Sequence, residues 1–171
     1  MKCYYYSVSS NKRVPPDHRP SGAAFLLAQV GAHGARRFAG RVAEIGLTAP
    51  DAGLLRKIAS DPGVSQQVLA DHLGVMPSRM VLLVDELETK GIVERRRSTE
   101  DRRNYALHLT ARGHQVLGQL SRVAAEHDES LCAALSKEER VQLRDLCRRI
   151  AEEQGLTPGV HPGYRHLGTK R

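Results

Sequence analysis

The chain has 171 residues, of which 40% are hydrophobic, and a formal net charge of +7 at pH 7. This is enough for one domain with a buried core, and with no Trp and two Phe that core must be largely aliphatic. No apolar run reaches the length of a membrane span, and the start of the chain lacks the apolar stretch of a secretory signal, so we expect a cytoplasmic protein. Three cysteines without a C-x-x-C motif argue against a disulfide framework and a structural zinc ribbon.

Both ends of the chain are basic and have little aliphatic content. Residues 1–20 include two adjacent prolines, which predicts an irregular N-terminal arm. Residues 155–171 hold two prolines, four glycines and no acidic residue, which predicts a flexible basic tail. Each end carries a net charge of +3, so residues 21–154 carry only +1.

Two helices are predicted before the central part of the chain. The first runs over about 21–45 with one apolar stripe and ends at Gly46; we assign 21–46 as a dimerisation helix. The second begins at Thr48, because Thr48-x-x-Asp51 is a capping-box pattern and Pro50 suits a first turn.

A short helix, a tight turn and a longer helix follow. Ser65 is the expected N-cap of the short helix and Gly74 its expected left-handed end. Pro77 suits the first position of the longer helix, which runs to Lys90. On its outer side we expect Glu86 to pair with Lys90 at i,i+4 spacing.

The period then changes from helical to alternating. One strand begins at Ile92, and Tyr105, Leu107 and Leu109 alternate along a second strand. Residues 91–112, which span this hairpin, contain six arginines and three acids, a net charge of +3. A helix pair followed by a basic hairpin predicts a winged helix-turn-helix over 47–110, with positive charge placed to meet DNA phosphates.

Two more helices are predicted after the hairpin. Thr110 caps one that runs to about Leu135, and Ser136 with Glu139 forms a capping box for the last. We assign 111–154 as dimerisation helices, because their apolar faces are longer than a winged helix needs for its own core. The predicted fold class is therefore mainly α with a small β wing, in a homodimer.

The central stretch resembles a known family. It reads LADHLGV-x-PSRM-x-x-LVDELETKGIVERR, followed by Asp101-x-Arg103 and by Leu109-Thr110-x-x-Gly113, and it is similar to the MarR family of winged-helix regulators. The resemblance extends from about Ser21 to Gln154. It implies a triangular dimer that binds a palindromic double-stranded DNA operator.

The resemblance also implies roles for individual residues. Arg103 would enter the minor groove with Asp101 holding its guanidinium, and Arg79 at the start of the longer helix would face the major groove. The chain departs from the family at Met76, where Ser or Thr is common, and at Val81 and Leu82, where polar residues are common. The full set of expected DNA contacts is Gln66, Gln67, Pro77, Ser78, Arg79, Leu82, Arg95, Arg96, Arg97, Asp101, Arg102 and Arg103.

For a small-molecule effector, the resemblance implies a pocket between the dimer helices and the winged helix. His33, Arg36 and Arg37 are candidates to bind an anionic phenol-like ligand there, with simple solvent exposure of the arginines as the alternative. The cysteines Cys3, Cys132 and Cys147 keep a thiol-responsive regulator open as a second alternative. We expect no metal site and no cofactor, because no ligand spacing or nucleotide-binding motif is present.

Together these features favour a dimeric DNA-binding transcriptional regulator, in this family most often a repressor, released by a ligand. The alternative from another class is a winged-helix scaffold that binds protein without specific DNA reading, which Met76, Val81 and Leu82 favour. No motif of a hydrolase, zinc protease, P-loop or Rossmann enzyme is present, so we do not expect an enzyme.

Overall fold

The computed structural model describes residues 22–97, 105–161 and 164. They divide into two compact units, 1–33 and 34–171, and each is taken by itself. Helices and strands follow in the order α1 Ala23–Glu44, α2 Ala49–Ser60, α3 Gln66–Leu73, α4 Pro77–Thr89, β1 Val93–Arg97, β2 Tyr105–Leu109, α5 Ala111–Leu131 and α6 Lys137–Glu153. None of the described helices is long and apolar enough to span a membrane.

The described part of the first unit is the N-terminal half of α1. Its apolar side chains Phe25, Leu26, Leu27 and Val30 are all exposed to solvent in the single chain. They lie at the i, i+1, i+2 and i+5 positions of one helix, and none of the described residues of the unit covers them.

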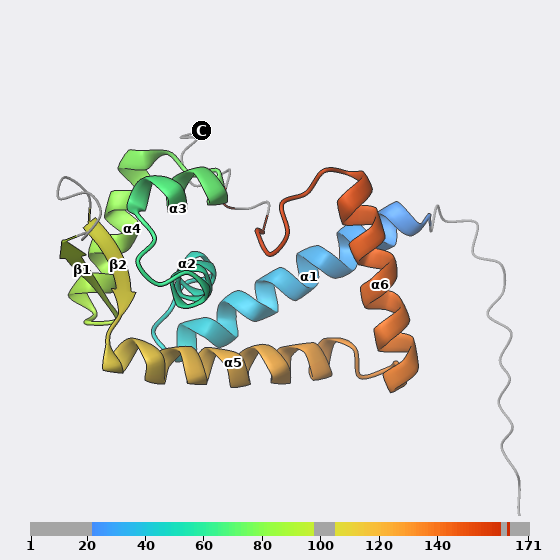
Figure 1. The fold of residues 1–171 in the computed structure, drawn as a ribbon. Helices are drawn as coiled ribbons and strands as arrows, with labels where there is room; N and C mark the ends of the chain where they lie inside the picture. The colour runs from blue at the N-terminus through green and yellow to red at the C-terminus, as the bar shows by residue number, and fades with distance from the viewer. Residues whose placement is uncertain (1–21, 98–104, 162–163, 165–171) are drawn as a thin grey trace, which may run out of the picture. The chain divides into compact units, whose positions relative to one another are not determined.

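In the second unit, α2, α3, α4 and the two strands gather into one bundle (Figure 1). β1 and β2 pair antiparallel, with Val93 opposite Leu109 and Arg97 opposite Tyr105. Residues 63 and 64, just before α3, bond to β2 as well: the Gly63 N–H donates to the Leu107 carbonyl at 2.9 Å. Two helices followed by a hairpin that is tied back to the first of them is a winged helix, as the sequence predicts.

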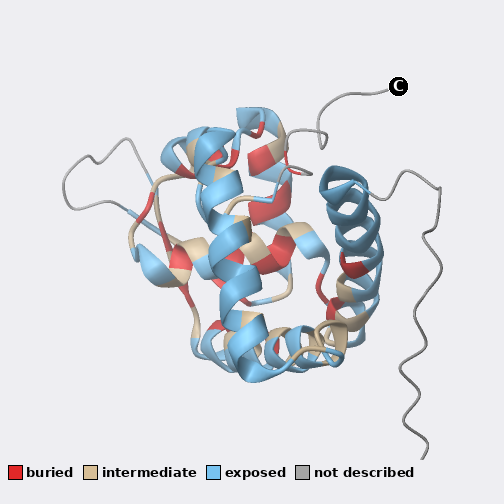
Figure 2. Cartoon of the chain, turned by 90° about the vertical axis from the view of Figure 1, so that its right-hand side faces the viewer, coloured by how far each residue is buried: buried red, intermediate tan, exposed pale blue. Residues whose placement is uncertain are grey.

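The core of this bundle is aliphatic, as the composition requires. The α4 residues Met80, Leu83, Val84 and Leu87 turn inward together, at the spacing of one helix face. Figure 2 shows the buried positions, in red, along the strands and on the inner sides of the helices of this bundle. The fully buried large side chains are Val42, Leu54, Leu55, Ile58, Leu69, Met80, Val84, Leu87, Val93, Leu107 and Leu120.

The helix boundaries follow the capping residues. Thr48 and Asp51 exchange bonds in a capping box at α2, with the Thr48 N–H donating to Asp51 Oδ2 at 2.9 Å. Ser136 and Glu139 do the same at α6. Both capping boxes were predicted. Each satisfies two N–H groups that the first helical turn leaves without partners.

The predicted pair between Glu86 and Lys90 is wrong. The Lys90 ammonium instead reaches Asp51 Oδ2 at 3.2 Å and the Gly46 carbonyl at 3.1 Å. Asp51 is completely buried, and its other oxygen, Oδ1, has no hydrogen-bond partner. A buried carboxylate without a cation is costly, whereas a surface ion pair contributes little free energy. Lys90 therefore pairs with Asp51 and links α4 to α2, instead of pairing with Glu86 within α4.

Two other expectations need correction. The helix after the wing was expected to run to about Leu135, but α5 ends at Leu131 with Cys132 as its C-cap. The 155–171 stretch was expected to be a flexible tail, but Tyr164 is 5% exposed and belongs to the hydrophobic core. Its hydroxyl donates a hydrogen bond of 2.6 Å to the Pro50 carbonyl in the first turn of α2.

Candidate nucleic-acid interface

The helix pair is positioned by caps and by one left-handed glycine. The Ser65 hydroxyl accepts a bond from the Val68 N–H at 3.2 Å and starts α3. Gly74 ends α3 with φ of +64°, a conformation that costs a residue with a Cβ about 1–2 kcal/mol. The chain therefore turns within three residues, and Pro77 opens α4.

The outer side of α4 begins with small and apolar groups. Ser78, Val81 and Leu82 are exposed, and Leu82 keeps 52% of its surface. Met76 holds the N-cap position without any side-chain bond to the helix, as its thioether predicts. An uncapped N-terminus leaves N–H groups and the positive end of the helix dipole available to an anion such as phosphate.

Arg79 lies in the first turn of α4 and is half buried. Its Nε is enclosed by protein but has no hydrogen-bond partner among the described residues. A guanidinium with an unused donor at the start of a recognition helix has the chemistry to bind guanine or phosphate.

Arg95 differs from the other arginines of the wing. Its guanidinium contacts Asp85 at 2.5 Å and pairs with Glu88, both on α4, and its Nε donates to Gln66 Oε1 at 3.3 Å. Only 16% of its side chain is exposed. Arg95 therefore joins β1, α4 and α3, and its expected contact with DNA stays a prediction.

The glutamines that open α3 have different partners. Gln66 Oε1 accepts a hydrogen bond from Arg95 Nε. The buried Nε2 of Gln66 has no partner among the described residues. Gln67 is exposed, and its Nε2 donates to Asp71 Oδ1 at 2.9 Å, one turn later in α3. Both lie at the N-terminus of α3, where phosphate contacts were expected, and those contacts stay a prediction.

The other two arginines of β1 are exposed. Arg96 is exposed and pairs with Glu94 on its own strand, with Nε 3.0 Å from the carboxylate. Arg97 is exposed at the end of β1. The expected contacts Asp101, Arg102 and Arg103 lie outside the described residues, which resume at Tyr105.

The Leu109-Thr110-x-x-Gly113 motif has a structural reason at the base of the wing. The Thr110 hydroxyl donates to the Gly91 carbonyl at 2.7 Å and accepts from the Gly113 N–H at 3.0 Å. A Cβ on Gly113 would lie 2.1 Å from the Ile92 carbonyl oxygen, so only glycine fits. The motif therefore ties the base of the wing to the first turn of α5.

The three expected ligand residues divide between the two units, and their binding of a ligand stays a prediction. His33 is exposed and belongs to the first unit. In the second unit Arg36 is exposed, and Arg37 donates to Ser130 Oγ on α5 at 2.9 Å. A cavity of the second unit is lined by other residues, chiefly from α2 and from Pro158, Gly159, His161 and Tyr164.

Beside Arg37, His127 packs its ring 5.4 Å from that of Phe38. Burial lowers the pKa of His127 below its ordinary value, and the nearby positive charges of Arg41 and Arg37 lower it further. This imidazole is therefore largely neutral at pH 7, and its buried Nδ1 has no partner among the described residues.

Sequence reasoning missed the acids Asp85 and Glu88 as partners of Arg95. Their i,i+3 spacing on α4 places both on one side of the helix. The described residues contain no group of three His, Cys, Asp or Glu that could hold a metal ion. The thiols of Cys132 and Cys147 are free and half buried.

The residues of this interface fall within a region that is similar to known proteins. The MarR family model matches residues 47–105, which are α2, α3, α4, both strands and their connections. A putative transcriptional regulatory protein for the hcr operon of Thauera aromatica is 39% identical over 106 residues, 62% of this chain and 64% of that protein. The match thus spans slightly less than two thirds of that relative.

Two solved structures have the same fold. The transcriptional repressor CouR, bound to a 23-mer DNA duplex, has a TM-score of 0.68 and 28% identity, over 76% of this chain and 92% of that one. The Mycobacterium tuberculosis MarR family protein Rv2887, in complex with salicylic acid, has a TM-score of 0.63 and 27% identity, over 77% and 98%. In its helix pair and its wing this chain is therefore similar to proteins of the MarR family over residues 47–105, and it shares its fold with solved members of that family.

Proposed function

We propose that this protein is a homodimeric regulator, most plainly a repressor, whose paired winged helices bind a palindromic DNA operator. The observation that carries the proposal is the exposed N-terminal side of α4, uncapped at Met76, next to a strand that ends in exposed arginines. Arg96 and Arg97 continue toward 98–104, where three further charged side chains of the expected DNA contacts lie in the sequence. Such a surface attracts DNA phosphates from beside the recognition helix.

The pairing of two copies is supported by apolar surface that the single chain leaves open. Phe25, Leu27 and Val30 on α1 are exposed, and so are Leu146 and Ile150 on α6. Contiguous apolar side chains of this kind are unusual on a monomer and typical of an interface. A two-fold dimer would cover both sets and present two α4 helices to major grooves roughly 34 Å apart, hence the palindrome.

Regulation by a small molecule follows from the relatives. Rv2887 was solved with salicylic acid, a phenol that carries a carboxylate, and CouR was solved with DNA. An effector of this protein would have to favour one spacing of the two winged helices over another, because equal affinity for both arrangements would not change DNA binding. A DNA-binding regulator works in the compartment that holds the DNA. We therefore propose that this protein is cytoplasmic, as expected from its sequence.

A protein-binding scaffold is the second candidate, and one observation favours it. Val68, Met76, Val81 and Leu82 are exposed apolar side chains on α3, α4 and the turn between them. On DNA, such groups would pack against thymine methyls, whereas on a scaffold they would contact protein.

A gel-shift titration separates the two candidates. The duplex is the region upstream of the protein's own gene, the control duplex is its scrambled sequence, and both are titrated at two salt concentrations. A regulator binds the palindromic duplex more tightly than the scrambled one and loses affinity steeply as salt rises, because it releases counterions from phosphates. A scaffold without DNA reading shows no preference between the two duplexes.

A further inference from the structure

Tyr164 is docked against α2, far from its neighbours in sequence. Its hydroxyl donates to the Pro50 carbonyl at 2.6 Å, and the residue is one of the buried members of the core. Burial raises the pKa of the Tyr164 hydroxyl far above its ordinary value. The phenol therefore stays protonated and keeps this hydrogen bond throughout the physiological pH range.

A glycine in the middle of α2 leaves the space that this phenol fills. A Cβ built on Gly53 would lie 1.8 Å from the Tyr164 oxygen and 2.7 Å from Cζ, so any larger residue displaces the ring. Glycine inside a helix is less favourable than alanine, yet a Cβ at Gly40 or Gly118 would meet nothing within 4 Å. Of these three helical glycines, Gly53 alone is matched to a side chain from another part of the chain.

Residues 155–161 lead from α6 toward this tyrosine, and together with Tyr164 we call them the C-terminal strap. The strap begins with a sharp turn at the end of α6. Gly155 has a φ of +63°, and the Leu156 N–H donates to the Ala151 carbonyl at 2.9 Å. These are the two marks of a Schellman motif, which directs the chain away from the helix it ends.

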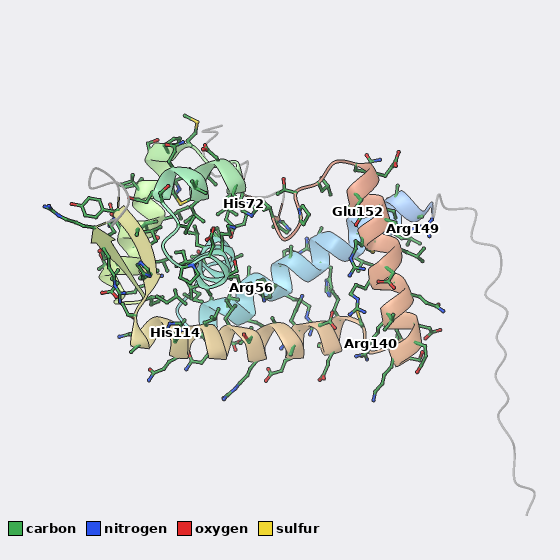
Figure 3. All side chains as sticks on the ribbon, in the orientation of Figure 1. Arg56, His72, His114, Arg140, Arg149 and Glu152 are labelled. Atoms are coloured by element: carbon green, nitrogen blue, oxygen red, sulfur yellow. The ribbon has the colours of Figure 1, made fainter. Side chains whose placement is uncertain are left out.

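The strap lies against α2 and the end of α3. Val160 packs on the hydrophobic core, and Pro158 and Gly159 line a cavity that residues of α2 and α3 also line. Figure 3 labels two of those residues, Arg56 and His72, and shows the segment after α6 approaching this side of the bundle. The strap therefore carries the chain from α6 back to the winged helix.

This strap is a second link between the winged helix and α6. The first link is α5, whose first turn is bonded to the base of the wing through Thr110 and whose end leads into α6. One link leaves a hinge at each of its ends, whereas two links between the same parts restrict their relative movement. The strap also lies beyond Gln154, where the resemblance seen in the sequence ends.

We propose that Tyr164 and Gly53 are positioning residues that hold the winged helix relative to α6 and thereby set which operator spacing the dimer accepts. The separation of the two half-sites follows from the geometry of the protein dimer. A winged helix that is held accepts one separation, whereas a released one shifts to meet others. The effect on operator choice rests on the proposed function, but the restraint itself does not and is measured without DNA.

Melting temperatures in a double-mutant cycle test the docking of the strap. Tyr164→Ala should lower the melting temperature by at least about 5 °C, as expected for the loss of a buried aromatic side chain. Gly53→Ala should also lower it, because the new Cβ displaces the ring. In the Tyr164→Ala protein, Gly53→Ala should instead raise it by about 2–4 °C, since only the helix-forming advantage of alanine remains. Gly118→Ala is the matched control and should raise it in both backgrounds.

Spin labels measure the restraint without DNA. Glu86→Cys on α4 and Gln142→Cys on α6 place labels at two exposed positions of one chain in which each native cysteine is changed to Ser. An excess of unlabelled protein leaves only distances within single chains. The distribution of label-to-label distances should broaden in Tyr164→Ala, whereas Tyr164→Phe keeps the ring and should stay close to the wild type.

Operator duplexes test the functional consequence. The reference is the operator found upstream of the protein's own gene, and the comparison duplexes carry one or two extra base pairs between the half-sites. We expect the extra base pairs to cost the wild type at least about tenfold in affinity and Tyr164→Ala no more than about threefold. Circular dichroism of each variant reports whether the winged helix is still folded.

Three results would each overturn the proposal. They are a Gly53→Ala substitution that raises the melting temperature of the wild type as it does that of Tyr164→Ala, an unchanged distance distribution in folded Tyr164→Ala, and equal losses of affinity with spacing in both proteins. Failure of the proposed function looks different: a protein that prefers no operator duplex but shows the sign reversal and the broadening keeps its strap as a restraint and loses only the effect on operator choice.

Discussion

The winged helix and α6 use apolar residues in opposite ways. Within the winged helix, Leu69 and Leu87 are fully buried against neighbouring elements of the same chain. On α6, Leu146 and Ile150 recur at helical spacing, and both remain about half exposed. The first region satisfies its own hydrophobic face, whereas the second needs another surface. The winged helix thus buries its apolar side chains within the chain, whereas α6 leaves apolar side chains open to another surface.

The largest effect is expected where the second region loses its apolar face. Leu146→Glu combined with Ile150→Glu places two charges in the proposed dimer interface and should raise the dimer dissociation constant by roughly a thousandfold or more, a change typical of interface hot spots. Analytical ultracentrifugation measures it. Arg144→Glu with Arg148→Glu is the matched control, because these positions lie about 200° around the helix axis from the first pair. Dissociation of the control alone would reverse the assignment of the interface.

A core truncation in the winged helix is the next largest. Leu69→Ala removes a completely buried side chain from α3 and should lower the free energy of unfolding by about 2–5 kcal/mol. Its neighbour Val68 is half exposed, so Val68→Ala should change stability by less than about 0.5 kcal/mol. Urea denaturation of both variants gives the comparison. Equal losses would mean that α3 packs differently from the arrangement described here.

The buried carboxylate of Asp51 predicts a smaller loss. Lys90→Met leaves this carboxylate without its cation and should cost about 1–2 kcal/mol at pH 7, less than a fully buried pair because Lys90 is partly exposed. Asp51→Asn added to Lys90→Met should restore part of the loss. The surface pair of Lys57 and Asp61 supplies the control: Lys57→Met should have little effect on the midpoint of urea unfolding.

The smallest effect concerns pH and His127. Its folded-state pKa is lowered, so the unfolded chain takes up this proton first as pH falls below about 6.5. As the pH falls, protonation of His127 in the unfolded chain lowers the free energy of unfolding. This loss begins near the pKa of the unfolded state and is complete once the pH is below the pKa of the folded state. His127→Gln should reduce the change in melting temperature between pH 7.5 and 5, whereas the exposed His114→Gln should leave it unaltered.

The local features of the fold could be predicted because each depends on residues close in sequence. The caps at Ser65, Thr48 and Ser136, the left-handed turn at Gly74 and the absent cap at Met76 all follow from one side chain and its next turn. The alternation of Tyr105, Leu107 and Leu109 gave β2 in the same way.

Partners far apart in sequence could not be predicted in this way. Lys90 chooses Asp51 over Glu86 only because α2 lies next to the end of α4. Arg95 looked like any other wing arginine, and what separates it from Arg96 is the strand register that turns it toward α4. Tyr164 packs against Gly53, and the sequence offers one sign of this contact. Gly53 lies in the middle of a predicted helix, where a glycine usually marks the close approach of another part of the chain.

The most direct test of the DNA-binding account is the affinity of an Arg103→Ala variant for the operator duplex, measured by fluorescence anisotropy beside the wild type. Arg103 lies outside the described residues, six positions after Arg97 in the sequence. We predict an affinity at least about tenfold weaker, the loss expected for one groove contact, with the dimer mass and melting temperature unchanged. An operator affinity equal to that of the wild type would contradict the assignment of the wing as a DNA-binding element.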